Sequence, residues 1–267
     1  MTDTRATSMA PEGLRFSISR SLSMTFGVLG RNFVPMMVIA LVVTAIQGVI
    51  EYVLAGGIPT EGEGGNSSSF LNIISYGVIT APITYATFQD LRGTRVGLSS
   101  MMSGGFKKIV PVIGAALVVG IVVAVPIIVG VFLYFASTTI GVAATIATGA
   151  FAFFILVTWF ALVPVQVVES VGFIGSFGRA AALSKGRRWG LLGLLLVYLV
   201  IIIGISIVIF GIIGVIAATA SMIALVLVIP FLALYSVLGA ILPSVVYYLL
   251  RSEKEGVGID EIAKVFD

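Results

Sequence analysis

The sequence predicts an all-α integral membrane protein whose six transmembrane helices form three parallel hairpin repeats with short interfacial helices, and whose two termini lie in the cytoplasm. Hydrophobic residues make up 59% of the 267 residues and charged residues only 10%, whereas charged residues are about a quarter of a soluble domain. The apolar stretches have the length of one or two spans of about 20 residues. All 15 Lys and Arg lie in the two tails or in alternate connections, which indicates the orientation.

Several classes of function are excluded by the residues that the chain lacks. It contains no Cys and no His, so it has no disulfide, thiolate nucleophile, Cys-ligated metal or imidazole base. The formal net charge of +3 comes from cations scattered at segment ends and not from a basic stripe, which argues against nucleic acid as a partner. No acid and base are brought together by the sequence pattern, so we expect neither an enzyme nor a cofactor.

The N-terminal part is predicted to be a polar tail, residues 1–13, followed by an amphipathic helix. The tail has no short apolar core with a cleavage site, so it is not a cleaved signal peptide. From Leu14 to Gly30, apolar residues such as Ile18, Leu22 and Phe26 recur at helical spacing. Two interpretations stay open: a helix lying in the membrane interface, or the cytoplasmic start of the first span.

The membrane domain is predicted to cover residues 14–250. A Gly-rich acidic segment, GGIPTEGEGGNSSS, separates the first two spans, because it cannot stay in hydrocarbon. A second amphipathic stretch, GLSSMMSGGFKK, follows the second span. The later spans pair through turns expected near 136–141 and 217–221. The predicted spans are 33–55, 70–89, 109–136, 141–168, 189–217 and 221–250.

After the last span, residues 251–267 are predicted to form a charged tail. Ile259, Ile262 and Val265 suggest a short amphipathic helix within it.

The distribution of charge decides the number of spans and their orientation. The segment Leu162–Leu192 joins two long apolar regions and contains Arg179, Lys185, Arg187 and Arg188, so we expect it on the cytoplasmic side. Five or seven spans would place a cationic terminus opposite the other cations. Six spans leave three carboxylates as the only external charges. These are Glu51, Glu61 and Glu63.

A spacing of about 80 residues recurs along the chain and indicates an internal repeat. Each even span has a proline near its cytoplasmic end, and each odd span follows a cation. Hairpins of one orientation would be parallel repeats about an axis along the membrane normal. The prolines would bend the helices and widen the bundle on the cytoplasmic side. The alternative is that any six-span chain alternates spans and loops. The prolines are Pro82, Pro164 and Pro243, and the cations are Arg31, Lys107 and Arg187.

Two segments of the C-terminal half carry a resemblance to a known family. The first has a proline, an acidic residue and a glycine, then an arginine-led helix and a tryptophan. The second has tyrosines, an arginine and a Lys-Glu-Gly ending. The first segment is Pro164-Val-Gln-Val-Val-Glu169-Ser-Val-Gly172, with Ser176-Phe-Gly-Arg179-Ala-Ala-Ala-Leu-Ser-Lys185-Gly186 and Trp189. The second is Tyr247-Tyr-Leu-Leu-Arg251-Ser-Glu-Lys-Glu255-Gly-Val257.

These segments are similar to the membrane domain of membrane-anchored glycerophosphodiester phosphodiesterases and of related stand-alone, uncharacterised bacterial membrane proteins. The resemblance implies the membrane fold and a bacterial cytoplasmic (inner) membrane. In family members with a phosphodiesterase, the chemistry belongs to a separate soluble barrel that uses carboxylates, His and a metal. This chain has no His, so the resemblance implies no activity for it.

The candidate site residues fall into two groups. We expect Glu169, at the end of a span, to pair with Arg179 or Arg188 in a structural role. The cations near the predicted interface are candidates for contact with anionic lipid head groups: Arg20, Arg31, Lys107, Lys108, Arg179, Lys185, Arg187 and Arg188. The residues expected at helix bends or a cavity are Pro82, Thr84, Tyr85, Pro164, Gln166, Glu169, Pro243 and Tyr247.

Two hypotheses on function follow. The first is a non-enzymatic membrane module that binds lipid or a membrane partner protein, as an accessory or scaffold subunit. The second is a transporter or channel for small molecules or lipids, which requires a polar cavity lined by Thr84, Tyr85, Gln166 and Tyr247 that reaches the middle of the membrane. The sequence leaves the oligomeric state open.

Overall fold

A computed structural model of the chain describes residues 15–54, 65–169, 171–217 and 221–263, and these residues contain helices and no strand. The all-helical prediction is therefore confirmed. Four predicted features fall wholly or partly outside the described residues. They are the polar tail 1–13, the acidic loop after residue 54, the turn near 217–221 and the end of the C-terminal tail with Val265.

The helices follow one another in three groups along the chain. A short helix precedes two long ones at the N-terminus, again before residue 109, and again before residue 188. The first group is α1 (Ile18–Arg31), α2 (Phe33–Leu54) and α3 (Gly65–Leu91). The second is α4 (Leu98–Phe106), α5 (Ile109–Ala136), α6 (Thr138–Thr158) and the short α7 (Leu162–Val168). The third is α8 (Phe173–Ser184), α9 (Arg188–Ala217), α10 (Ser221–Glu255) and the short α11 (Ile259–Ala263).

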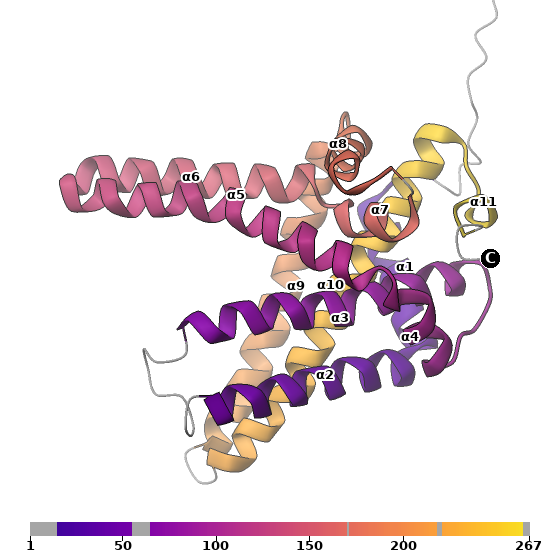
Figure 1. Cartoon of the computed structure of the whole chain (residues 1–267), viewed down its shortest axis with the longest axis horizontal. Helices are drawn as coiled ribbons and strands as arrows, with labels where there is room; N and C mark the ends of the chain where they lie inside the picture. Colours follow the sequence, from indigo (N-terminus) through magenta and orange to yellow (C-terminus); the bar gives the residue numbers. More distant parts are fainter. Residues whose placement is uncertain (1–14, 55–64, 170, 218–220, 264–267) are drawn as a thin grey trace, which may run out of the picture.

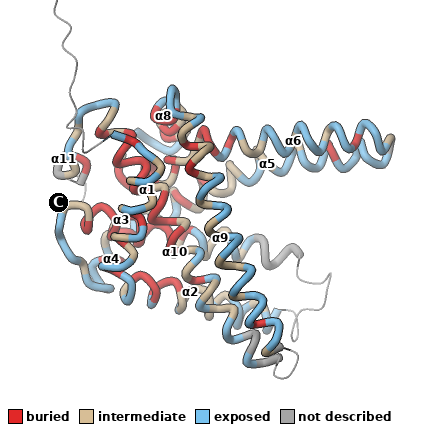
Figure 2. Tube along the Cα trace, turned by 180° about the vertical axis from the view of Figure 1, so that it is seen from behind, coloured by how far each residue is buried: buried red, intermediate tan, exposed pale blue. Residues whose placement is uncertain are grey.

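The short helices gather at one end of the molecule, and the long helices extend from this base in pairs (Figure 1). Helix α10 is central, because it packs against α1, α2, α3 and α9. Its segment from Leu238 to Leu250 is mostly buried. In Figure 2 the buried residues gather where α1, α3 and α10 meet, whereas the projecting parts of α5 and α6 and most of α9 are exposed. The packed core is therefore the base, and the hairpins diverge from it.

Five helical segments among the described residues are long and apolar enough to cross a membrane. The most apolar windows of α5 and α9 are only 6% buried. Exposed apolar helices of this length are compatible with an integral membrane protein, because lipid covers such surfaces. Helix α3, where the second span is predicted, is more polar and is not among the five. The five segments are Phe33–Leu54, Ile109–Phe135, Thr138–Val168, Arg188–Ile216 and Val226–Glu255.

The predicted fourth span is not one continuous helix. Helix α6 ends at Thr158, a turn follows, and α7 begins at Leu162 with Pro164 in its first turn. Proline has no N–H and its ring clashes with the carbonyl four residues earlier, so a continuous helix cannot pass through this position without a kink. The carbonyl of Thr158 instead accepts a hydrogen bond from the Ser184 hydroxyl of α8. Pro82 and Pro243, by contrast, lie inside the helices α3 and α10.

The N-terminal amphipathic segment is a helix of its own, separated from α2 by Asn32. Its buried residues are Ser21, Thr25 and Val28, and it packs against α10 and α9. Phe26 of the predicted apolar face is 41% exposed. Small side chains let two helices approach closely, and Ile18, Leu22 and Leu29 pack against the core beside them.

Helix α10 continues to Glu255 without a break, beyond the boundary predicted at residue 250. Ser252 is buried, and its hydroxyl donates to the Val257 carbonyl. Ile262 of α11 is also buried. The residues after 250 thus belong in part to the packed base.

Candidate functional site

Glu169 lies at the centre of a charged network that joins α7, α8 and α10. Its Oε2 accepts a hydrogen bond from Arg179 Nε at 2.7 Å, and its Oε1 accepts one from the Tyr247 hydroxyl at 2.8 Å. Arg251 donates to the same hydroxyl at 2.7 Å. Glu255 completes the ring, because it pairs with Arg179 at 2.5 Å and with Arg251 at 2.9 Å. The predicted pairing of Glu169 with Arg179 is confirmed.

This network holds its members in a fixed arrangement. The Glu169 side chain is only 8% exposed, so its charge depends on the hydrogen bonds it accepts. Burial opposes the charge on Arg179, but the hydrogen bonds to Glu169 and Glu255 outweigh it and raise the pKa of Arg179. The hydrogen-bond donors of Arg179 are therefore engaged within the protein, so Arg179 is a weak candidate for binding a lipid head group.

A second charged cluster joins the end of α1 to the end of α3. Arg31 donates through two nitrogens to the Asp90 carboxylate, at 2.6 to 3.1 Å. The Asn32 side-chain amide donates to Asp90 at 2.7 Å. The hydrogen bond to Asp90 raises the pKa of Arg31. A bidentate pair of this kind fixes both position and orientation, so Arg31 fastens the end of α1 to the end of α3 at the base.

A third set of contacts fastens α8 and the start of α9 to the end of α10. Arg187 pairs with Glu253, which also accepts a hydrogen bond from the backbone N–H of Phe16. The Lys254 ammonium donates to the carbonyls of Ala182 and Lys185. These carbonyls lie at the C-terminal end of α8, where backbone carbonyls lack a full set of helical partners, so the lysine helps to cap that helix.

Sequence reasoning treated Arg31 and Arg187 as head-group candidates and did not assign them partners. Glu253 and Glu255 lie in the predicted charged tail, and Asp90 was assigned no role. One signal was present: each acidic residue ends a long helix, and cations begin the next unit.

The other predicted cations are less constrained. Arg20 donates to the Arg15 carbonyl at 2.8 Å. The Arg188 guanidinium lies 5.1 Å from the centre of the Phe154 ring. For Lys107, Lys108 and Lys185, the described residues place no carboxylate within ion-pair distance.

Lys108 lies at a cavity of about 590 Å³ between the start of α5 and the α7–α8 connection. Val110, Pro111 and Phe173 form its apolar wall, and Gln166 and Glu169 also line it. The Gln166 amide donates to the Phe173 carbonyl. Burial lowers the pKa of Lys108. The cavity thus combines an apolar wall with a cation that has no carboxylate partner in the described part of the chain.

The residues predicted to line a common polar cavity do not do so. Thr84 and Tyr247 are fully buried in packed helices, and Ser244 donates to Thr84 at 3.3 Å. The Tyr85 ring lies against Gly104 of α4. Of the four residues predicted for that polar cavity, only Gln166 lines the cavity at Lys108, whereas Glu169 of the wider group lines the same cavity and Pro243 lines a separate one between α3, α5 and α10. The helix-bend candidates lie apart as well, in α3, α7 and α10. These are Pro82, Pro164 and Pro243.

Among the described residues no group of three or more His, Cys, Asp or Glu is placed to hold a metal ion. A scan against protein-family models and searches of curated proteins and of solved structures found no match to this chain.

Proposed function

We propose that the chain is a six-span, non-enzymatic membrane module that binds an anionic lipid head group at the cavity beside Lys108. The observation that carries the proposal is the chemistry of that cavity. Lys108 has no carboxylate partner among the described residues, and an apolar wall lies beside it. A lipid phosphate would supply the missing anion, and its acyl chain would cover the wall.

Exposed apolar side chains near the short helices support a position at the membrane interface. Phe106 is 67% exposed beside Lys107, and Trp189 is 84% exposed beside Arg188. Phe33, at the start of α2, is also exposed. Aromatic side chains next to cations are typical of the boundary between head groups and hydrocarbon. In this proposal the base lies at the cytoplasmic surface, in a bacterial inner membrane.

The two segments that resemble the membrane domain of the phosphodiesterase family contact each other in the charged network. The two resembling segments lie far apart in sequence, yet Glu169 and Arg179 of the first bind Tyr247, Arg251 and Glu255 of the second. We propose that the chain shares this family's membrane fold, with three units of a short helix and two long ones as its repeat. The succession of helices supports this reading.

Removing the charges beside the cavity should weaken the binding of anionic lipid. Each Lys near an anionic surface contributes about 1 kcal/mol, so Lys107→Gln with Lys108→Gln should weaken phosphatidylglycerol retention about 30-fold. Native mass spectrometry of the purified chain, titrated with phosphatidylglycerol and with phosphatidylcholine, measures this.

The matched control removes two charges elsewhere, by Arg95→Gln with Lys185→Gln. Neither residue lines the cavity, so retention should change less than about threefold, as for charges that touch no bound head group. Equal losses in the two double variants would contradict a specific site and leave only a general attraction between charges.

Labelling of introduced cysteines tests the six-span topology, because the native chain has no Cys. We expect Gly65→Cys, at the start of α3, to react with an impermeant thiol reagent in intact cells. Lys185→Cys should react only after permeabilisation. Lys185 is preferable to the next residue, because Gly186 has a φ of 83° that a cysteine would strain. Labelling of both positions from one side would disprove the span count.

A further inference from the structure

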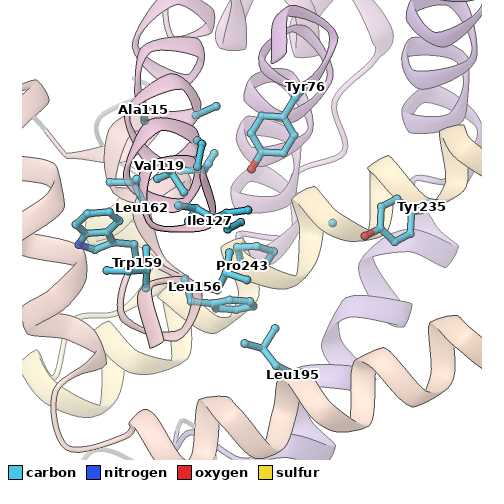
Figure 3. Close-up of a pocket in the computed structure, with 18 residues that line it drawn as sticks. Tyr76, Ala115, Val119, Ile127, Leu156, Trp159, Leu162, Leu195, Tyr235 and Pro243 are labelled. Atoms are coloured by element: carbon cyan, nitrogen blue, oxygen red, sulfur yellow. The ribbon is translucent and has the colours of Figure 1, made fainter. Parts of the chain in front are cut away.

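Two cavities adjoin each other on the side of α3 and α10 that faces away from the charged base. The larger has a volume of about 670 Å³ and lies in the fork between α3, the α5–α6 pair and α10 (Figure 3). The smaller, of about 430 Å³, lies between α2, α3 and α10. Tyr76, Ala116 and Tyr235 line both cavities, so the two adjoin each other at these residues.

The larger cavity is apolar. Its wall consists of aliphatic and aromatic side chains such as Val119, Ile127 and Leu195, with Trp159 at one edge (Figure 3). Its volume lies within the range of about 300 to 1,000 Å³ typical of small-molecule sites. In a membrane an apolar space between diverging helices does not hold water, because water there finds no polar partners. A hydrocarbon chain is the occupant that fits.

The smaller cavity has a mixed lining, in which polar but uncharged side chains lie among apolar ones. Thr44, Gln47, Asn72, Ser75 and Ser236 contribute hydroxyl and amide groups to its lining. The Gln47 amide donates to Asn72 at 2.9 Å and to Glu51 at 2.9 Å. The amides are therefore held in place, and the adjacent carboxylate is an acceptor. No Lys or Arg lines either cavity.

The two tyrosines mark the boundary between the polar and the apolar part. Figure 3 shows Tyr76 on α3 and Tyr235 on α10 with their hydroxyl groups directed towards the space between these helices. Gln47 precedes the end of α2 at Leu54 by about 10 Å along the helix axis, at 1.5 Å per residue. In a membrane, Gln47 would therefore lie near the depth at which a lipid head group joins its acyl chain.

We propose that the two cavities together bind one neutral, single-chain lipid whose head group carries hydroxyls, of the monoacylglycerol class. The chain would occupy the apolar cavity, and the hydroxyls would bond to the amides and hydroxyls around Gln47 and Asn72. A phosphate head group is disfavoured, because no cation lines the polar cavity and Glu51 lies beside it. The site is separate from the cavity at Lys108, so it goes beyond the proposed function and does not depend on it.

Fluorescence of Trp159 provides a direct test. The chain has two tryptophans, and Trp189→Phe removes the one that lies outside the cavity. The probe is 9,10-dibromostearoyl glycerol, added to the purified full-length chain in micelles, and the comparison lipid has the same brominated chain on a lysophosphatidic acid head group. We expect saturable quenching by the neutral lipid at a concentration at least 10-fold lower than for the anionic one.

Variants with matched controls locate the binding. Gly239 lines the larger cavity and has open space around the position of a Cβ, so Gly239→Leu should fill the cavity and reduce quenching at least fivefold. Gly149 has equally open surroundings on α6 but does not line the cavity, so Gly149→Leu should leave quenching unchanged. Gln47→Leu should weaken the binding of the neutral lipid at least threefold and should change the binding of the anionic lipid little.

Two results would overturn the proposal. If quenching is equally strong in the Gly239→Leu and Gly149→Leu variants, the lipid only surrounds the protein and does not enter the cavity. Preference for the anionic lipid would refute the neutral head group. Circular dichroism and gel filtration of each variant verify that the variant is folded, and Ala116→Leu, which fills the same space from α5, supplies a second variant if Gly239→Leu fails to fold.

Discussion

Replacing Arg179 with glutamine is expected to lower the free energy of unfolding by about 2 to 3 kcal/mol. The change removes the hydrogen bond to Glu169 and the ion pair with Glu255. Glu169 is only 8% exposed, and it keeps Tyr247 as a donor while Arg251 stands 3.8 Å away. A buried carboxylate with fewer donors is costly, and this cost exceeds the net stabilisation of the intact pair.

A double-mutant cycle measures the coupling. Glu169→Gln combined with Arg179→Gln removes the charge on both partners, so the double variant should be more stable than the sum of the single changes predicts, by about 1 kcal/mol or more. Reversible unfolding in mixed micelles gives the free energies. Lys185→Gln is the control, because Lys185 is exposed and has no carboxylate partner among the described residues. A coupling energy below about 0.5 kcal/mol, which means that the effects of the two substitutions simply add, would contradict the network's role.

The sequence predicted the positions of the long helices closely, because length and hydropathy alone determine them. The predicted 109–136 is α5, Ile109–Ala136, and the predicted 33–55 contains α2, Phe33–Leu54. An apolar run that ends at charged residues leaves little freedom in where a helix begins or ends. The all-helical class follows from the same signal.

The prediction failed where tertiary contacts decide. The apolar spacing of the N-terminal helix indicated an interfacial helix or the start of the first span, yet Ser21 and Thr25 on its polar side are buried within the protein. Hydropathy cannot distinguish an apolar face directed to lipid from one directed to protein, because both environments are apolar. The partners of Arg31 and Arg187 could not be found either, because Asp90 and Glu253 are brought to them only by the return of the next helices.

Replacing Gly105 with alanine is expected to lower the free energy of unfolding by about 2 to 3 kcal/mol, because α4 touches α3 there without any space for a side chain. A Cβ at Gly105 would lie 2.5 Å from the Cα and the N of Pro82, and 2.9 Å from the carbonyl carbon of Ala81. These are backbone atoms inside a helix, so no rotamer change relieves the clash. The substitution must push α4 away from α3 or distort the helix at the proline.

Gly104 provides the contrast that separates a backbone clash from a side-chain clash. A Cβ there would meet the ring of Tyr85 at 2.5 to 2.6 Å. Gly104→Ala should therefore cost little stability when it is introduced into a Tyr85→Ala variant, because the clashing ring is gone. Gly105→Ala should cost as much stability in that variant as it does in the native chain. Gly149→Ala, in open surroundings, should be neutral or stabilising by up to about 1 kcal/mol. If Gly105→Ala unfolds at the same denaturant concentration as the native chain, α4 does not lie on Pro82.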